Sequence, residues 1–239
     1  MKIKLSGICK QFGERVLDCV EAEMESGELL ALVGNNGAGK TTLMKIMASL
    51  SMPTDGQVLI DGEPLCRSRI DLRARLHYLS DSPFFLSDSP IDHICLAAAL
   101  YNRPLQPLKQ QIVDWLRQFD VLEVAEKPLR NLSRGQKYKI AFIGLLAANP
   151  EFWILDEPFA AGVDPIGISA IKRSINKVVG AGGIVIYSTQ IVEIAEQFSD
   201  RVWILHKGKL KIDTPTADVA KTNQAFGLAG VFEQLRVAK

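Results

Sequence analysis

The nine residues 34–42 constrain this chain more than any other feature, because their sequence GNNGAGKTT contains the pattern G-x-x-x-x-G-K-[ST]. They follow the apolar run 29–33 and precede a helix-forming stretch. Glycines let the backbone curl so that successive N–H groups face an anion, and the next helix adds the positive end of its dipole. A chance match is expected on the order of 1 in 100 times in a chain of this length. The pattern predicts a loop that holds nucleotide phosphates, and the alternative of a plain glycine-rich turn stays open.

Within this loop, each side chain has an expected task. The Lys40 ammonium is expected to clamp the phosphates, and the Thr41 hydroxyl to bind the Mg²⁺ ion that bridges the β- and γ-oxygens. The residues expected to contact the nucleotide here are Gly34, Asn35, Asn36, Gly37, Ala38, Gly39, Lys40, Thr41 and Thr42.

A second motif lies far along the chain, where residues 152–155 read FWIL and are followed by Asp156, Glu157 and Pro158. The run is too short and too rich in bulky apolar residues for a helix, which favours a buried strand. Ligands of open α/β sheets bind at the tips of parallel strands. We therefore expect Asp156 to reach the magnesium ion and Glu157 to polarise an attacking water. Taken alone, an Asp-Glu pair after a strand is more often a solvated turn.

Composition narrows the function classes. The chain has 239 residues, 47% of them hydrophobic, which is enough for a full core. Its 28 basic and 27 acidic residues nearly cancel, so direct binding to a nucleic acid is not expected. The four cysteines, Cys9, Cys19, Cys66 and Cys95, show no C-x-x-C spacing, which argues against a zinc site or a disulfide framework and favours a reducing compartment. The longest apolar stretch, 140–148, is too short for a bilayer span, so any membrane association is expected to be peripheral.

The order of the elements predicts an α/β fold with a largely parallel sheet. Strand-like runs occupy residues 2–8, 28–33, 57–60, 152–155, 184–188 and 201–205 and alternate with helix-like runs. Between residues 83 and 149 the strand signal disappears, and helical spacing covers residues 91–100, 107–119 and 134–148. A helical insertion into the α/β core is the economical explanation.

Inside this insertion, Leu132, Ser133, Arg134, Gly135 and Gln136 read LSRGQ. The order of phosphate loop, helical insertion, LSRGQ and FWILDEP resembles the nucleotide-binding domain of ATP-binding cassette (ABC) proteins, whose signature is usually written LSGGQ. As a lone feature, Ser-x-Gly-Gln before a helix is more often a plain N-cap.

The resemblance covers nearly the whole chain and implies a P-loop NTPase fold in one nucleotide-binding domain. Residues 1–82 and 150–239 would form a RecA-like core, with a mostly parallel sheet flanked by helices and a small antiparallel N-terminal β part. Residues 83–149 would form the helical subdomain that contains the signature.

The same resemblance implies a site shared by two copies. Ser133, Gly135 and Gln136 of one copy would complete the ATP site of the other in a head-to-tail dimer of identical or homologous chains. Phe12 matches the aromatic position that stacks on adenine, although an isolated phenylalanine is more often partial core. Asp164 resembles the Asp that communicates across the dimer, one residue farther from Asp156 than usual.

Two positions depart from the family pattern. Asp81 stands where a Gln or Glu usually contacts magnesium and the attacking water, and an Asp keeps an oxygen ligand on a shorter side chain. Gln190 stands where the family has a histidine facing the γ-phosphate; it can donate a hydrogen bond but cannot become a cation. Loss of such a contact costs on the order of a few kcal/mol, so we expect a competent but slow ATPase.

The implied function is ATP hydrolysis that powers transport of an unknown substrate through a separate membrane permease, most similar to bacterial export-type systems. The subunit would be cytoplasmic and peripheral on the inner face of the membrane. The permease would dock beside Asp81, where residues 82–86 read SPFFL, although these aromatics fit the subdomain core equally well. A non-transport ABC ATPase and an ATP-gated regulatory module remain alternatives.

Overall fold

The structure, a computed structural model, describes residues 1–160 and 162–218. A six-stranded sheet runs through its centre in the order β10-β9-β3-β8-β7-β6. Neighbouring strands are parallel except for β9 and β10, which form an antiparallel pair at one edge. In sheet order the strands are β10 (Lys209–Pro215), β9 (Arg201–His206), β3 (Leu29–Val33), β8 (Ile184–Thr189), β7 (Phe152–Leu155) and β6 (Leu76–Leu79).

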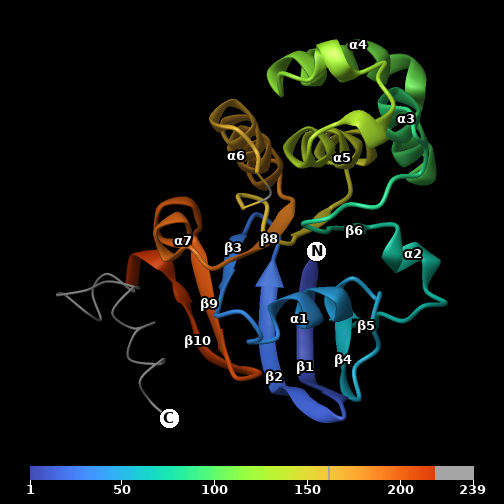
Figure 1. The fold of residues 1–239 in the computed structure, drawn as a ribbon. Coiled ribbons are helices and arrows are strands. Elements are labelled where there is room, and N and C mark those ends of the chain that lie inside the picture. Colours follow the sequence, from blue (N-terminus) through green and yellow to red (C-terminus); the bar gives the residue numbers. More distant parts are fainter. Residues whose placement is uncertain (161, 219–239) are drawn as a thin grey trace.

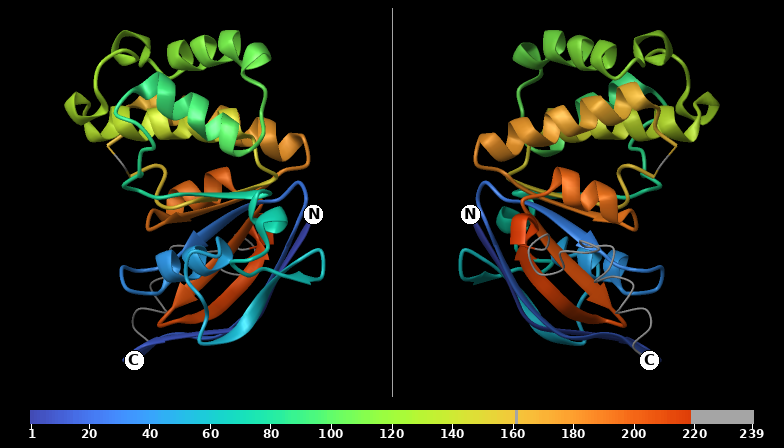
Figure 2. Two further views of the ribbon diagram at one scale, coloured as in Figure 1. Left: turned by 90° about the vertical axis from the view of Figure 1, so that its right-hand side faces the viewer. Right: turned by 90° about the vertical axis from the view of Figure 1, so that its left-hand side faces the viewer.

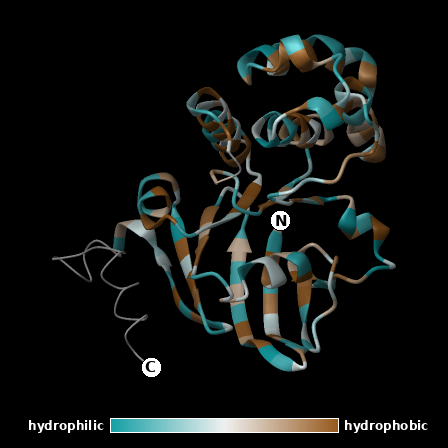
Figure 3. Cartoon of the chain, viewed as in Figure 1, coloured by the Kyte–Doolittle hydropathy of each residue, from teal (hydrophilic) through white to brown (hydrophobic). Residues whose placement is uncertain are grey.

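A second, antiparallel sheet of four strands lies below the first in Figure 1. Hydrophobic and hydrophilic residues alternate along its long strands, so that one face is buried (Figure 3). Its order is β2 (Glu14–Glu25), β1 (Lys2–Phe12), β4 (Asp55–Ile60) and β5 (Glu63–Pro64). The largely parallel sheet and the small antiparallel N-terminal part both agree with expectation.

Helices cover the two faces of the central sheet unequally. The larger group, α3 to α6, forms one layer above the sheets, as both views in Figure 2 show. The bounds are α1 (Lys40–Met47), α2 (Ile70–Arg73), α3 (Pro90–Leu100), α4 (Leu105–Gln118), α5 (Arg134–Ala148), α6 (Pro165–Gly180) and α7 (Val192–Phe198), with 3₁₀ turns η1 (Leu122–Val124) and η2 (Leu129–Asn131).

Two hydrophobic cores lie on opposite faces of the central sheet. Along β7, Trp153 and Leu155 belong to the core shared with the upper helices, whereas Phe152 and Ile154 belong to the core shared with α1 and the antiparallel sheet. All four side chains are fully buried. Successive residues of a strand point to opposite faces, so a run of continuously apolar residues is what a strand buried on both sides requires.

The expected helices agree with α3, α4 and α5, and the strand-like runs agree with six of the strands, in each case within a few residues at the ends. Four strands were not expected: β2, β5, β6 and β10, of which β5 has only two residues. β6 has only four residues, and β2 and β10 carry charged residues at alternating exposed positions. Such sequences give a weak apolar signal, and pairing with neighbouring strands decides their structure.

Candidate functional site

The loop between β3 and α1 curls where its glycines permit. Gly37 and Gly39 have φ angles of 79° and 105°, in the region that favours glycine. A Cβ on Gly34 would lie 2.6 Å from the Leu205 carbonyl oxygen, and one on Gly39 would lie 2.8 Å from the Leu17 side chain. Among the described residues, no side chain caps the first turn of α1, and that turn contains no acidic residue. Its N–H groups are therefore available to an anion.

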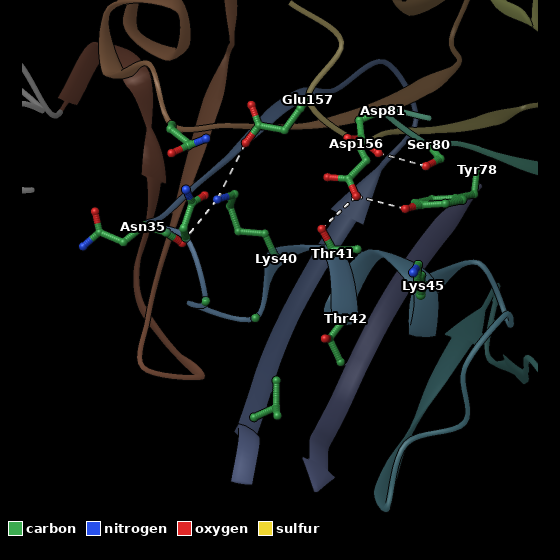
Figure 4. Close-up of a pocket in the computed structure, with 15 residues that line it drawn as sticks. Asn35, Lys40, Thr41, Thr42, Lys45, Tyr78, Ser80, Asp81, Asp156 and Glu157 are labelled. Atoms are coloured by element: carbon green, nitrogen blue, oxygen red, sulfur yellow. Dashed lines mark hydrogen bonds and ion pairs between the residues drawn. The ribbon is translucent and has the colours of Figure 1, made fainter. Parts of the chain in front are cut away.

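Lys40 begins α1, and its side chain folds back along the loop (Figure 4). The ammonium donates to the carbonyl oxygens of Gly34 at 2.7 Å and Asn35 at 3.4 Å, and it lies 3.8 Å from Glu157 Oε1. Burial lowers the pKa of Lys40 below 10.5, against the opposing influence of Glu157 and Asp156. A buried cation at the mouth of an anion-binding loop fits a phosphate ligand.

Asp156 lies at the tip of β7 and is almost fully buried, at the centre of three hydrogen bonds. Its Oδ2 accepts from the Thr41 hydroxyl at 2.8 Å and from the Tyr78 hydroxyl at 2.9 Å. Its Oδ1 accepts from the Ser188 hydroxyl at 2.6 Å. Figure 4 shows Thr41, Tyr78 and Asp156 pointing toward one another. Two of the three residues expected to bind magnesium, Thr41 and Asp156, thus come together from positions 115 residues apart in the sequence.

Glu157 follows with a φ of 49°, a left-handed conformation that is unusual for a glutamate. Its backbone N–H donates to the Ser188 hydroxyl at 2.9 Å, which ties the strained residue to the tip of β8. Burial raises the pKa of Glu157 above 4.5, Lys40 lowers it in part, and Asp156 and Asp81 raise it further. A carboxylate of raised pKa beside a cation has the properties of a general base.

Asp81 comes after the tip of β6 and lies in the same region of Figure 4. One of its carboxylate oxygens accepts from the Ser80 hydroxyl at 3.2 Å, and the other pairs with Arg134 at 3.1 Å. Arg134 is the third residue of LSRGQ. The loop after β6 and the signature of the same chain are therefore joined by an ion pair between two partly exposed side chains.

These residues surround one cavity of about 420 Å³. Six residues expected at the site line this cavity: Lys40, Thr41, Asp81, Asp156, Glu157 and Gln190, the last of which is exposed. Its full lining is Val16, Asn35, Asn36, Gly37, Gly39, Lys40, Thr41, Thr42, Lys45, Tyr78, Ser80, Asp81, Asp156, Glu157 and Gln190.

The oxygen donors at one end of this cavity fit a magnesium ion. Mg²⁺ prefers hard oxygen ligands, here the Thr41 hydroxyl and the carboxylates of Asp156 and Asp81. At the other end, Lys40 and the uncapped helix fit phosphates. The donor set therefore fits a magnesium-bound nucleoside triphosphate.

The signature residues lie outside the lining of this cavity. Ser133 caps α5, accepting from the Gln136 N–H at 3.2 Å, while the Gln136 side chain accepts from the Ser133 N–H at 3.0 Å. A Cβ on Gly135 would lie 2.3 Å from the Gly162 carbonyl oxygen, so glycine is required there by close packing on the loop before α6.

Asp164 caps α6 by accepting from the Gly167 N–H at 2.8 Å, and it pairs with Lys139 of α5. Lys139 is only 2% exposed. Partial burial raises the pKa of Asp164, but the hydrogen bonds from Lys139 and Gly167 lower it more, so that this pKa lies below 3.8. This pair fastens the signature helix to the loop after Glu157.

Phe12 lies at the end of β1, 62% exposed, with the Lys10 ammonium 4.6 Å from its ring centroid. It is not among the residues that line the cavity, whereas Val16 of the same hairpin is. The adenine role of Phe12 stays a prediction.

Sequence reasoning missed five residues at the site: Val16, Lys45, Tyr78, Ser80 and Ser188. Three of them, Tyr78, Ser80 and Ser188, lie at or just after the carboxyl ends of strands next to β7. The rule that located Asp156 at a strand tip would have found Tyr78 and Ser80, had β6 been recognised as a strand, and it applies equally to Ser188 near the end of the expected strand β8.

Comparisons with known proteins agree with this geometry. A family profile described as ABC transporter matches residues 17–160. An energy-coupling factor transporter ATP-binding protein of Methanocaldococcus jannaschii is 31% identical over 209 residues, which cover 85% of this chain and 75% of the relative. A putative ABC transporter ATP-binding protein of Methanosarcina acetivorans is also 31% identical and aligns with 93% of this chain, but the chain spans only 37% of that relative's length.

A solved structure of an ATP-binding subunit of an ABC transporter superposes with a TM-score of 0.91, covering 99% of this chain and all of the other, at 26% identity. The expected P-loop NTPase fold is thereby confirmed. None of the helices within the described residues is both long and apolar enough to cross a bilayer. The chain belongs to the ABC transporter family, as an ATP-binding subunit and ATPase that takes ATP with Mg²⁺.

Proposed function

We propose that this subunit binds and hydrolyses ATP between two cassettes and so powers transport through a separate membrane permease. The proposal rests on one observation: the phosphate loop and the carboxylates line one cavity, and the signature of the same chain does not. Lys40, Thr41, Asp156 and Glu157 converge on one cavity, while Ser133 lies outside its lining. A site that needs the signature is therefore completed by a second copy or a homologous cassette, arranged head to tail.

Each residue then has one role. Lys40 and the loop N–H groups hold the phosphates, and Thr41 and Asp156, with Asp81, hold the magnesium ion. When bound, that ion supplies positive charge that neutralises the phosphate oxygens. Glu157 accepts the proton of the attacking water, for which its raised pKa is suited. Ser133, Gly135 and Gln136 would contact the γ-phosphate bound to the opposite copy, and Phe12 would stack on the adenine.

The departures from the family pattern support slow turnover. Gln190 lines the cavity as a neutral side chain, so a cationic contact to the γ-phosphate is missing at this position. Asp81 is shorter than the usual residue and is paired with Arg134. A magnesium ion must compete with the Arg134 guanidinium for the Asp81 carboxylate.

A second, apolar cavity of about 370 Å³ supports the position proposed for the permease. It lies where the loop after β6 meets α3 and α5, and the exposed side chains of Phe84 and Leu100 stand on its wall. Phe84 is 84% exposed and Leu100 is 66% exposed, and both line the same apolar cavity. Single exposed apolar residues are common, but exposed apolar residues grouped around one apolar cavity are typical of a binding surface. We propose that a helix of the permease docks here, next to Asp81. We further propose that residues 83–149 form the helical subdomain that offers this surface, while residues 1–82 and 150–239 form the core.

In this proposal the permease, and not this subunit, determines the direction of transport and selects the substrate. The archaeal relative at 31% identity is named for an energy-coupling factor transporter. The expectation of an export-type system therefore stays a prediction, as does a location on the cytoplasmic face of the membrane.

The proposal is tested by membrane association and ATP turnover in the source cell and in vitro. Phe84→Asp with Leu100→Asp should release the subunit from membranes but leave its ATP affinity unchanged. Ile70→Asp is the matched control, because Ile70 is 73% exposed on α2 and does not line the apolar cavity. Unaltered membrane association of the double variant would refute the docking surface. Full turnover without any membrane fraction would favour the non-transport ATPase, and binding without turnover would favour the regulatory module.

A further inference from the structure

Two cysteines ten residues apart in the sequence meet on the antiparallel sheet. The Sγ atoms of Cys9 on β1 and Cys19 on β2 are 3.1 Å apart, and the Cys19 N–H donates to Cys9 Sγ at 3.3 Å. Both are free thiols. Cys19 is exposed and Cys9 is half-buried, so neither thiol is fully buried in a core.

A β-bulge brings the two sulfurs together. Ile8 pairs with Val20 and Lys10 pairs with Leu17, so Cys9 alone faces two residues of β2, Asp18 and Cys19. Leu17 and Val20 are both buried although they are three positions apart, which breaks the period of two. Cys19 has a φ of 49°, as an inserted bulge residue can, and this turns its side chain to the face of Cys9.

We propose that Cys9 and Cys19 form a reversible oxidation site, which closes to an intrachain disulfide by exchange with a small disulfide such as oxidised glutathione and thereby weakens nucleotide binding. The second half rests on the proposed function, because it concerns the same phosphate loop.

The exchange balances in two steps. The thiolate of the exposed Cys19 attacks one sulfur of oxidised glutathione, and one glutathione thiolate leaves. The Cys9 thiolate then attacks Cys19 Sγ and expels the second glutathione thiolate. The two thiol protons of the protein go, through solvent, to the two released glutathiones. The protein loses two electrons and the glutathione disulfide gains them. Because Cys9 raises the pKa of the Cys19 thiol, the first step is expected to be slow at neutral pH.

A metal ion is the competing occupant, since Asp18 brings a carboxylate within reach of both thiols. Two features favour the disulfide. The sulfurs of a tetrahedral zinc site lie about 3.8 Å apart, as Zn–S bonds of about 2.3 Å require, and these are closer. Both oxygens of Asp18 are already paired, one with Arg15 at 2.7 Å and the other with Lys209 at 3.1 Å.

Two hydrogen bonds connect the bulge to the phosphate loop. The Asp18 N–H donates to the Gly208 carbonyl at 2.9 Å, and the Gly208 N–H donates to the Ala38 carbonyl at 3.1 Å. Val16, two residues before Asp18, lines the nucleotide cavity. A disulfide is about 2.05 Å long, so closing it moves the sulfurs together by about 1 Å. We expect that movement to disturb the bonds of Asp18 and Gly208.

The test equilibrates the full chain in glutathione redox buffers of increasing oxidised fraction and maps the cysteines by peptide mass spectrometry. The proposal expects a Cys9–Cys19 disulfide, reversed by dithiothreitol, while Cys66 and Cys95 remain thiols or carry glutathione. A Cys66→Ser, Cys95→Ser double variant retains the pair and should behave like the wild type. In Cys9→Ser the glutathione should remain on Cys19, because the resolving thiol is gone.

Binding of a fluorescent ATP analogue to the same samples tests the coupling. Oxidation should weaken binding several-fold in the wild type and leave the Cys9→Ser variant unchanged. Three results would overturn the proposal: a wild-type Cys19 that keeps its glutathione, Zn²⁺ that binds the reduced pair and blocks oxidation, or an oxidised chain with unchanged ATP affinity. The reduced wild type must bind the analogue in any case, and failure there would count against the proposed function instead.

Discussion

Ser188 holds the two carboxylates of the site in place, and its replacement by alanine is a sharp test of the geometry. The hydroxyl donates to Asp156 Oδ1 at 2.6 Å and accepts from the Glu157 N–H at 2.9 Å. The side chain is fully buried, so water cannot take its place readily. Ser188→Ala therefore leaves a carboxylate oxygen and a backbone N–H without this partner.

The two hydrogen bonds set the magnitude. A bond to a charged acceptor contributes about 1.5–3 kcal/mol and a neutral one about 1 kcal/mol, so the loss of both is about 2.5–4 kcal/mol. Glu157 also has a strained φ of 49°, which persists only where its surroundings hold it. We expect the variant to lose stability by roughly this amount in urea unfolding. We also expect turnover to fall more than ATP affinity, because Lys40 and the phosphate loop are untouched.

The matched control is Ser174→Ala on α6. The Ser174 hydroxyl donates to the Ala170 carbonyl at 2.8 Å and has no contact with the site. Its loss should cost about 1 kcal/mol or less and leave turnover unchanged. Equal unfolding free energies for the two variants, together with wild-type turnover in Ser188→Ala, would refute the positioning role of Ser188.

Four further changes test other parts of the structure. Glu157→Gln should lower turnover by about 100-fold or more with little change in ATP affinity. It should also remove the acidic limb of the kcat/KM profile, which lies above pH 4.5 because the pKa of Glu157 is raised. Turnover as fast as before would show that another group is the base. Gln190→His should preserve or raise turnover in the same assay, and complete loss would show a separate role for the glutamine. Asp164→Asn keeps the cap but removes the charge opposite buried Lys139, so urea unfolding should show a loss of up to about 3 kcal/mol, more than Lys139→Met causes. Burial lowers the pKa of His93 and of His77 to about 4. The unfolded chain binds protons at these histidines at a higher pH than the folded chain does, so stability should fall as pH drops from 6.5 toward 4. His93→Gln should make that slope shallower without abolishing it, and an unchanged slope would contradict the assignment.

The sequence predicts well where local chemistry decides the structure. Gly37 and Gly39 are required by backbone conformation, and the apolar run before Asp156 is required by burial on both faces, so both motifs are legible without coordinates. The helical ranges of α3 to α5 follow from periodicity alone.

The sequence does not predict contacts that only the folded chain creates. The hydrogen bonds of Tyr78 and Ser188 to Asp156 join residues 78 and 32 positions apart. The approach of Cys9 to Cys19 depends on one extra residue in β2, which shifts the register and appears in no motif. Arg134 is an ordinary exposed residue until the loop after β6 brings Asp81 to it.

The pairing of two copies through Ser133 is the central claim, and the mass of the particle in solution tests it most directly. Light scattering on Glu157→Gln, which should bind ATP without hydrolysing it, is expected to show a doubled mass when Mg²⁺ and ATP are added. Ser133→Arg in the same background should still bind ATP at its own phosphate loop but keep the mass of a single chain. Dimers of equal stability with and without the Ser133 substitution would contradict the account.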